Sequence, residues 1–447
     1  MSVISVMDGH ETWKIEGIPG MVVGSQIIFE HGLVLLSTMG GKDGIAIHAY
    51  DAVDGTPKYQ VAFPKKQEMK KVNLIKPPGA GTFSTKLKMI GHQAPIIDGD
   101  HMIVFYDYLR RIDLNTGQQV WMDMSEKKRP KEKDVPMLSK NYAPMQLRDG
   151  VLYTPYGKGL AAFDAATGQR KWLVEKIKGE VVSAMHFEGD KMYYRSGAVM
   201  KGEGKKAKML DAIYNGVNIA DGSMLWEKDV KLKGGVTNWV FRDAKIYVAF
   251  NERLYTIDKA TGSKGKPDKS DGKFKFKDGA PHTIKYDNGN LLVQGGQTVA
   301  MYDISGGDID KEKWRQYYKS PGAFGMFAKI AMGAISAMGY MDASQRAANS
   351  YSGSATNRIA NDQRKSAWSG FNNVMSARVQ ATASSDKYQY VLTKLDDGEG
   401  LKGINLKTGA ADREILLKEK KPDYEMDEAA GILFFLKKKE LSAFKLD

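Results

Sequence analysis

The stretch Gly159-Leu-Ala-Ala-Phe-Asp-Ala-Ala-Thr-Gly168, followed by Trp172, decides the fold. Its apolar first half predicts a strand, Asp-Ala-Ala-Thr-Gly predicts a tight turn, and the segment with Trp172 predicts a strand that returns antiparallel. Asp opens such turns because its carboxylate accepts hydrogen bonds from backbone N–H groups, and Gly closes them because it tolerates positive φ. One hairpin cannot bury its own surface, so the unit is expected to stack on copies of itself.

Copies of this turn recur along the chain. The nearest are Asp113-Leu-Asn-Thr-Gly117, Asn218-Ile-Ala-Asp-Gly222, Asp51-Ala-Val-Asp-Gly55 and Asp258-Lys-Ala-Thr-Gly262. Weaker copies end at Gly9, Gly307 and Gly409, which gives eight units, and an aromatic residue follows the glycine in most of them. The structural repeat residues are therefore predicted to be Trp13, Trp121, Trp172, Trp226 and Trp314, with Gly55, Gly117, Gly168, Gly222, Gly262 and Gly409.

Two further strand-like runs lie upstream of most turns, as in Ala143-Pro-Met-Gln-Leu147 and Gly150-Val-Leu-Tyr-Thr154. Four strands per unit form the blade of a β-propeller. The sequence thus predicts an all-β, eight-bladed β-propeller. A seven-bladed ring with one irregular unit is the alternative.

The two ends of the chain predict how the ring closes. Glu440-Leu-Ser-Ala-Phe-Lys-Leu-Asp447 resembles the strand before a turn, and Glu11-Thr-Trp-Lys-Ile15 resembles the strand after one. We therefore expect the N-terminal strand to complete the last blade, because closure removes exposed sheet edges. Residues 2–4 partly duplicate the C-terminal strand and have no place in this scheme.

The blade signature of an apolar strand, an Asp-x-x-Thr-Gly turn and a nearby Trp resembles the pyrrolo-quinoline quinone (PQQ) type propeller repeat. The resemblance covers most of the chain outside one insertion. That family contains quinoprotein dehydrogenases and also cofactor-free scaffolds of the bacterial envelope. The resemblance therefore implies a fold and leaves two classes of function open.

The absence of cysteine bears on this choice, since the chain contains none. By resemblance, the quinone enzymes carry an adjacent Cys-Cys pair beside the cofactor, so PQQ is disfavoured here. Neither the Asp303, Asp308 and Asp310 group nor Asp396-Asp397-Gly398-Glu399 has the spacing of a known calcium loop. The seven histidines include no HExxH pair. We expect no cofactor, no metal and no catalytic residue, and favour a non-enzymatic protein.

Basic residues exceed acidic ones, with 66 Lys and Arg against 53 Asp and Glu and a net charge of +13. The lysines form short, dispersed clusters mixed with acidic residues, a pattern typical of soluble loops and protected blade edges. An anionic surface or polysaccharide is the alternative partner that such charge allows. Nucleic acid is disfavoured, because no aromatic-plus-basic recognition motif accompanies the clusters.

One insertion interrupts the repeat between Gly307 and Gly409. Residues 321–341 are rich in Ala, Met and Gly and predict a helix. A membrane-spanning helix is disfavoured because Lys329 lies within it. The remaining interpretations are a helix packed on the propeller and a helix that docks to a partner or lies shallowly on a membrane. The candidate partner-binding residues are Phe324, Phe327, Ile330, Ile335 and Met338.

The predicted organisation is therefore propeller blades over residues 1–314, a helical and polar insertion over 315–387, and the remaining propeller strands over 388–447. We expect a binding scaffold for another protein, not an integral membrane protein. A quinone- or metal-dependent oxidoreductase, or a small-ligand binder that uses the central channel, is the alternative. The resemblance implies the periplasm or cell envelope, whereas Met1 as the native start implies the cytoplasm.

Overall fold

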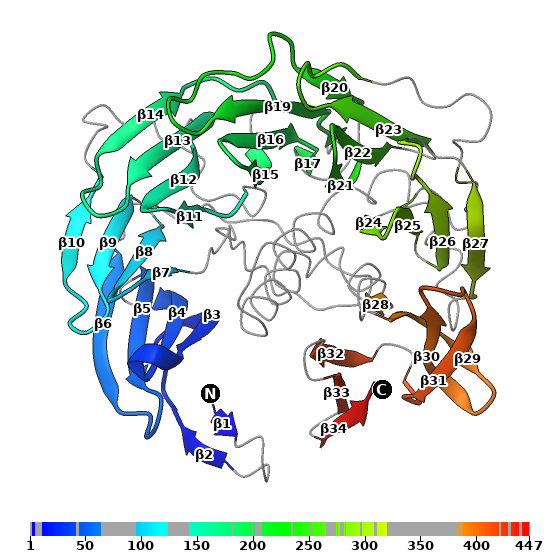
Figure 1. Cartoon of the computed structure of the whole chain (residues 1–447). Coiled ribbons are helices and arrows are strands. Elements are labelled where there is room, and N and C mark those ends of the chain that lie inside the picture. Colours follow the sequence, from blue (N-terminus) through cyan, green and yellow to red (C-terminus); the bar gives the residue numbers. More distant parts are fainter. Residues whose placement is uncertain are drawn as a thin grey trace. The chain divides into compact units, whose positions relative to one another are not determined.

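The structure is a computed structural model of the 447-residue chain. It describes residues 2–4, 11–41, 44–63, 95–106, 108–123, 143–179, 182–198, 200–201, 208–233, 236–250, 253–264, 274, 276–277, 281, 283–295, 297–307, 311–319, 382–384, 387–419, 422–427, 431–437 and 440–446. Within these residues every element is a β-strand except the 3-10 helix η1 (Phe29–His31) (Figure 1). The all-β prediction is confirmed. The helix predicted for residues 321–341 lies outside the described residues.

The chain divides into two compact units. The first comprises Met1–Val182, Ile219–Gly222 and Arg346–Gly370, and the second comprises Ser183–Asn218, Ser223–Gln345 and Phe371–Asp447. Among the described strands six sheets have four strands each, and in every sheet the paired strands run antiparallel. Repeated four-stranded antiparallel sheets are what the turn motif predicts.

The first unit begins with a two-stranded hairpin, followed by three four-stranded sheets (Figure 1). The hairpin is β1 (Ser2–Ile4) and β2 (Glu11–Lys14). The three sheets are β3 (Met21–Ile28), β4 (Leu33–Gly41), β5 (Gly44–Asp51) and β6 (Pro57–Phe63); β7 (Ile96–Asp98), β8 (His101–Phe105), β9 (Leu109–Asp113) and β10 (Gln119–Met122); and β11 (Gln146–Arg148), β12 (Val151–Tyr156), β13 (Gly159–Asp164) and β14 (Arg170–Val174).

The second unit holds the remaining sheets, in which consecutive strands are again neighbours. They are β15 (Val182–Glu188), β16 (Lys191–Gly197), β19 (Ala212–Asn218) and β20 (Val230–Leu232), with the small hairpin β17 (Met200–Lys201) and β18 (Lys208–Met209); β21 (Val236–Arg242), β22 (Lys245–Phe250) and β23 (Arg253–Asp258); β24 (Thr283–Asp287), β25 (Asn290–Gln294), β26 (Thr298–Asp303) and β27 (Glu312–Tyr317); β28 (Thr382–Ser384), β29 (Tyr388–Leu395), β30 (Gly398–Asn405) and β31 (Ala411–Leu416); and β32 (Asp423–Asp427), β33 (Ile432–Lys437) and β34 (Glu440–Lys445).

Successive sheets within each unit pack face to face. In the first unit Leu35 and Ile47 lie in one cluster with Met102 and Ile112 of the next sheet. The middle strands are apolar on both faces because a sheet covers each face, whereas the outer strands alternate. Strand β13 shows the first pattern and β6 the second. Burial of each such aliphatic side chain contributes roughly 1.5–3 kcal/mol.

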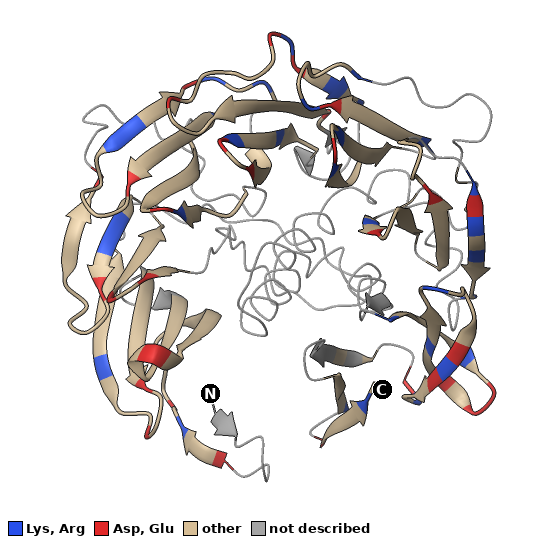
Figure 2. Cartoon of the chain, viewed as in Figure 1, with Lys and Arg blue, Asp and Glu red and all other residues tan. Residues whose placement is uncertain are grey.

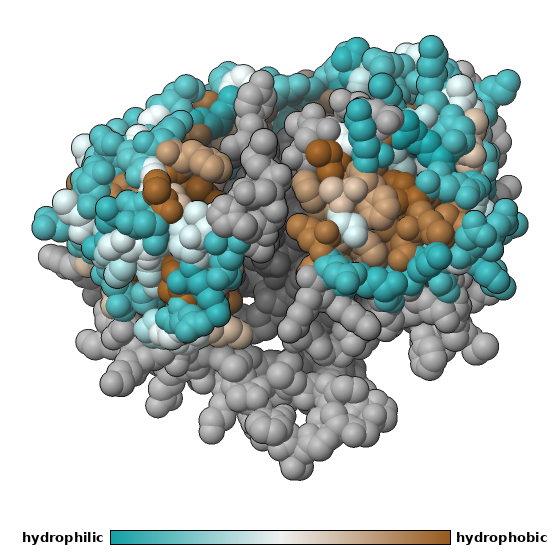
Figure 3. Space-filling model, turned by 90° about the horizontal axis from the view of Figure 1, so that it is seen from below, coloured by the Kyte–Doolittle hydropathy of each residue, from teal (hydrophilic) through white to brown (hydrophobic). Residues whose placement is uncertain are grey.

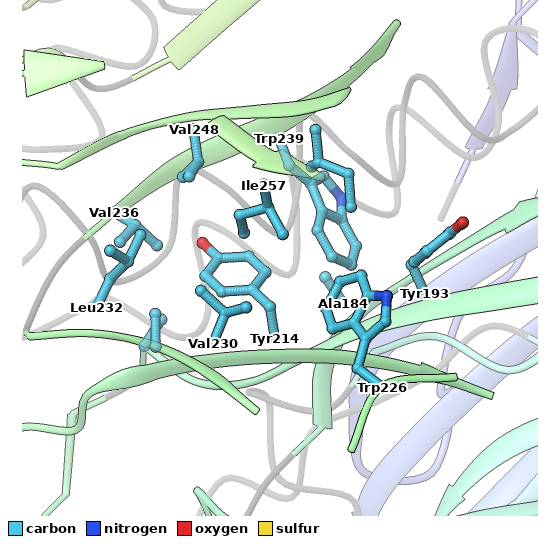
Figure 4. Close-up of a cluster of buried hydrophobic side chains, with 13 residues drawn as sticks. Ala184, Tyr193, Tyr214, Trp226, Val230, Leu232, Val236, Trp239, Val248 and Ile257 are labelled. Atoms are coloured by element: carbon cyan, nitrogen blue, oxygen red, sulfur yellow. The ribbon is translucent and has the colours of Figure 1, made fainter. Parts of the chain in front are cut away.

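Figure 4 shows the corresponding layer of the second unit, between the sheets of β15–β20 and β21–β23. The rings of Tyr214 and Trp239 are tilted by 50° with centroids 5.7 Å apart, and Ile257 and Val248 belong to the same cluster. These side chains are almost fully removed from solvent. Aromatic packing thus joins neighbouring sheets throughout the unit.

The predicted pairing of the two chain ends is not formed among the described strands. Strand β2 was expected beside the C-terminal strand, but it pairs with β1. Strand β34 pairs with β33 and forms an edge of its three-stranded sheet in the described part of the chain. Residues 2–4, which have no place in the predicted ring, form β1 and pair with β2, which follows closely in the chain.

Candidate protein-binding surface

The predicted aromatic residues pack on the turn glycine of the following sheet, not on the glycine of their own turn. The Trp121 indole covers Gly168, where an added Cβ would lie 2.7 Å from indole Cδ2. Its N–H donates to the carbonyl oxygen of Ala165 in the same turn at 3.0 Å. Gly168 also has a φ of +73°, so both space and backbone conformation favour glycine. The same contact joins Trp13 to Gly55, Tyr59 to Gly117, Trp172 to Gly222, Trp226 to Gly262 and Trp314 to Gly409.

The turns are organised by the Asp that opens each of them. Asp113 Oδ1 accepts hydrogen bonds from the hydroxyl and the backbone N–H of Thr116, at 2.9 and 2.8 Å, and from the backbone N–H of Asn115 at 2.9 Å. These bonds favour the ionised carboxylate, so Thr116 holds the pKa of Asp113 below its usual value. Asp164 and Asp258 have the same arrangement and also have lowered pKa values. These carboxylates are occupied by the turn and do not form a reactive pair.

Buried polar side chains tie one sheet to the next. In the first unit Arg111 donates to the Asp98 carboxylate at 2.6 Å and to the Ala165 carbonyl at 2.8 Å. In the second unit Asn238 on β21 donates to the Ile284 carbonyl of β24 at 2.7 Å and accepts from its N–H at 2.8 Å. Asn238 thus imitates a strand neighbour across two sheets. Such fully paired groups specify packing.

The described residues hold no group of three or more His, Cys, Asp or Glu side chains that could bind a metal. A groove of about 380 Å³ lies beside the contact of Trp226 with Gly262. It is lined by residues 227–231 and 261–264, which carry charges of both signs. Lys231, one of them, forms an ion pair with Asp211 at 2.8 Å.

The surface charges are interleaved in sign along the strands seen in Figure 2. Several lysines of the outer strands pair with the Asp of the preceding turn, as Lys58 does with Asp51 at 3.0 Å and Lys313 with Asp303 at 3.5 Å. Exposed pairs of this kind contribute little stability. They do distribute the excess of lysine over the sheets.

Strand β3 and the helix η1 that follows it offer the clearest apolar surface of the first unit. β3 is an edge strand, hydrogen-bonded to β4 on one side only among the described strands. Met21 is 50%, Ile27 41% and Phe29 82% exposed, and Val22 is exposed too. An apolar edge strand presents both unpaired backbone groups and side chains to an incoming strand. We call residues 21–29 the β3 edge.

The C-terminal sheet offers a second apolar surface. One face of this sheet, which carries Leu433 and Phe435, is buried against the sheet of β28–β31. Leu436 and Leu441 lie opposite each other on β33 and β34 and are 43% and 63% exposed. Figure 3 shows an apolar surface over this sheet. Its edge strand β34 and this face are unpartnered in the described part of the second unit.

The sequence-predicted partner residues Phe324, Phe327, Ile330, Ile335 and Met338 lie outside the described residues. The repeat tryptophans and glycines are brought together in pairs, each pair from two sheets. Sequence reasoning missed the β3 edge, because an exposed strand edge depends on which strands are neighbours. The apolar run Met21-Val-Val was the available signal.

No described helix is long and apolar enough to cross a membrane.

The stacked four-stranded sheets and their aromatic-on-glycine contacts define a propeller-type repeat protein. The family model described as "Outer membrane protein assembly factor BamB" matches residues 2–206. The match places residues 2–206 with the PQQ-like repeat family. No curated protein matches the chain.

Three solved structures illustrate what the chain is similar to. The computationally designed protein Ika8 is 11% identical, with 98% of this chain and 100% of that chain covered and a TM-score of 0.46. BamB from Moraxella catarrhalis is 16% identical, with 64% and 83% covered and a TM-score of 0.29. The C-terminal WD40 domain of Sif2 is 8% identical, with 66% and 72% covered and a TM-score of 0.35. Likenesses of this size are no guide to function.

Proposed function

We propose that this chain is a non-enzymatic β-propeller scaffold that binds another protein within an assembly of the bacterial envelope. The observation that carries the proposal is the β3 edge, where Met21, Val22, Ile27 and Phe29 are exposed and the strand has β4 as its one neighbour among the described strands. Exposed apolar side chains on a sheet edge are typical of interaction sites. The description of the matching family, an outer membrane assembly factor, supports the envelope as the location.

A partner strand added to the β3 edge would gain two kinds of interaction. The backbone groups on the side of β3 away from β4 would supply main-chain hydrogen bonds, and alternate side chains would supply apolar contacts. Phe29 is the natural anchor because large aromatic residues dominate interface energies. An extended, apolar segment of another protein is therefore the partner chemistry that we propose.

The ring is proposed to have eight blades, closed by β2 as the fourth strand of the C-terminal sheet. Two separate observations support closure. Trp13 of β2 covers Gly55 as the fourth-strand aromatics of other sheets cover the turn glycine of the next sheet. The C-terminal sheet has three described strands and an open edge at β34. Closure would remove that edge.

The segment 321–341 is proposed as a second contact element, on the sequence evidence alone. Phe324, Phe327, Ile330, Ile335 and Met338 share one side of the predicted helix, and methionine-rich surfaces adapt to partners. We propose no cofactor. The quinone enzymes that the repeat resembles carry a Cys-Cys pair beside the cofactor, and this chain contains no cysteine.

The experiment is affinity capture from the native host with the full chain, followed by titration of the purified partner. Ile27→Thr with Phe29→Ser should weaken binding about tenfold or more, which corresponds to roughly 1.4 kcal/mol. The control Val120→Ser removes a 51% exposed apolar side chain on β10, in another sheet, and should leave binding unchanged. A parallel variant replaces Phe324, Phe327, Ile335 and Met338 by Ser. Purified chain that carries a quinone or metal in stoichiometric amount would contradict the scaffold.

A further inference from the structure

The outer hairpins of the sheets follow one register rule. The aromatic residue of the fourth strand lies opposite the third-strand residue that stands two positions before the turn. Trp172 pairs with Ala162, and a β-bulge follows at once, so that Phe163 pairs with Arg170. The sheets of β7–β10, β24–β27 and β3–β6 repeat the pairing and the bulge. This bulge sets the direction of the aromatic side chain toward the next sheet.

The N-terminal hairpin obeys the same rule. Trp13 on β2 pairs with Val3 on β1, and after a bulge Ile4 pairs with Glu11. The Trp13 indole N–H donates to the Ala52 carbonyl at 2.9 Å, as Trp121 does to Ala165. By register and by contact, β2 is a fourth strand, and β1 occupies the place of the third strand beside it.

The C-terminal strand β34 is also a third strand. The backbone N–H of Leu446 donates to the Gly431 carbonyl at 2.7 Å, as Ala165 does to Gly150 at 2.8 Å in the sheet of β11–β14. Leu446 is buried, as Ala165 is. In the sheet of β11–β14 the donor of this bond, Ala165, directly follows the turn residue Asp164. Leu446 is the corresponding donor at the C-terminus, so Lys445 corresponds to Asp164. The fourth-strand place beside β34 is open among the described residues.

We propose that β1 and β34 are alternative partners for one edge of β2, and that β34 displaces β1 when the last sheet is completed. The proposal rests on the closure stated above. It predicts a specific register, with Ala443 opposite Trp13 and Ser442 opposite Lys14. In the hairpin, Ser2 takes that same place opposite Lys14.

The balance between the two pairings favours β34. β1 has three residues and β34 has six, so β34 offers more ladder positions. A completed sheet would also cover the exposed Leu436 and Leu441. β1 would protect the edge of β2 while the C-terminal strands are still unsynthesised, when an open edge invites wrong pairing.

The chain contains no cysteine, so introduced pairs are the only thiols. Lys14→Cys is combined with Ser442→Cys to report the β2–β34 pairing, and with Ser2→Cys to report β1–β2. Residues directly opposite each other in antiparallel strands lie within disulfide reach. Val3→Pro weakens β1 because proline cannot donate to the ladder, and Val3→Thr is the matched control that keeps strand propensity.

The measurement is the rate of intramolecular disulfide formation in the full chain, read on non-reducing gels. We expect both pairs to form, and expect Val3→Pro but not Val3→Thr to accelerate the K14C/S442C bond about fivefold. An unchanged rate with Val3→Pro would overturn the displacement and leave closure intact. If K14C/S442C never forms while S2C/K14C does, closure and displacement both fall. A disulfide between two copies would also overturn the proposal.

Discussion

Replacing Gly168 by Ala tests the contact that repeats from sheet to sheet. The new Cβ would lie 2.7 Å from Cδ2 and 2.8 Å from Cε3 of Trp121, so the indole must move. Movement would lose its hydrogen bond to Ala165, a contribution of about 1 kcal/mol. The φ of +73° adds about 1–2 kcal/mol of backbone strain for a non-glycine residue. The expected loss of unfolding free energy is therefore about 2–3 kcal/mol.

Gly150→Ala is the matched control, since Gly150 lies in the same sheet with a φ of +70° and nothing within 4 Å of an added Cβ. It should cost the strain alone, about 1–2 kcal/mol. Urea unfolding followed by near-ultraviolet circular dichroism measures both. The loss of unfolding free energy in the double variant Trp121→Ala with Gly168→Ala should be smaller than the sum of the two single losses, because the two residues are in contact. Equal losses for Gly168→Ala and Gly150→Ala would refute the contact as a source of stability.

Three further outcomes are expected. Thr116 lowers the folded-state pKa of Asp113. The carboxylate therefore stabilises the fold above its unfolded pKa of about 3.9, and this stabilisation is lost as pH falls through the lower folded-state pKa. In Asp113→Asn the free energy of unfolding in urea should depend less on pH below about 4. Asn238→Ala should cost about 2–3 kcal/mol in urea unfolding, because both backbone groups of Ile284 lose their partner. Leu441→Ser should cost about 1–2 kcal/mol if closure buries this side chain.

Each of these has its control. Asn238→Asp keeps the acceptor but sets a carboxylate oxygen against the Ile284 carbonyl oxygen, so its loss of unfolding free energy should be at least that of Asn238→Ala. Val53→Ser, at a 78% exposed site away from the sheet edges, should leave the urea midpoint unchanged and is the reference for Leu441→Ser. An Asp113→Asn variant whose midpoint follows the wild type at every pH would contradict the turn's pKa argument.

Much of the fold could be predicted from local sequence. The Asp113 and Asp164 turns follow from residue chemistry, since Asp accepts from the next backbone N–H groups and Gly accepts positive φ. The partner of each aromatic could not be predicted in this way. Trp121 is four residues from Gly117 in the chain but packs on Gly168, because stacking between sheets decides that contact.

The candidate surface was less accessible to sequence reasoning. Exposure of Ile27 and Phe29 depends on β3 being an edge, and strand order is a tertiary property. Asn238 gave no signal either, since its partners lie on β24, far along the chain. The role of residues 2–4 emerged only from the register of β1 on β2.

The most direct measurement is an experimental structure of the full chain that resolves the strand order of the C-terminal sheet. The account predicts eight sheets around one axis, with β2 beside β34 and Trp13 opposite Ala443 in the same molecule. A structure in which β34 keeps β33 as its one neighbour, or in which the number of sheets differs from eight, would contradict the proposed closure.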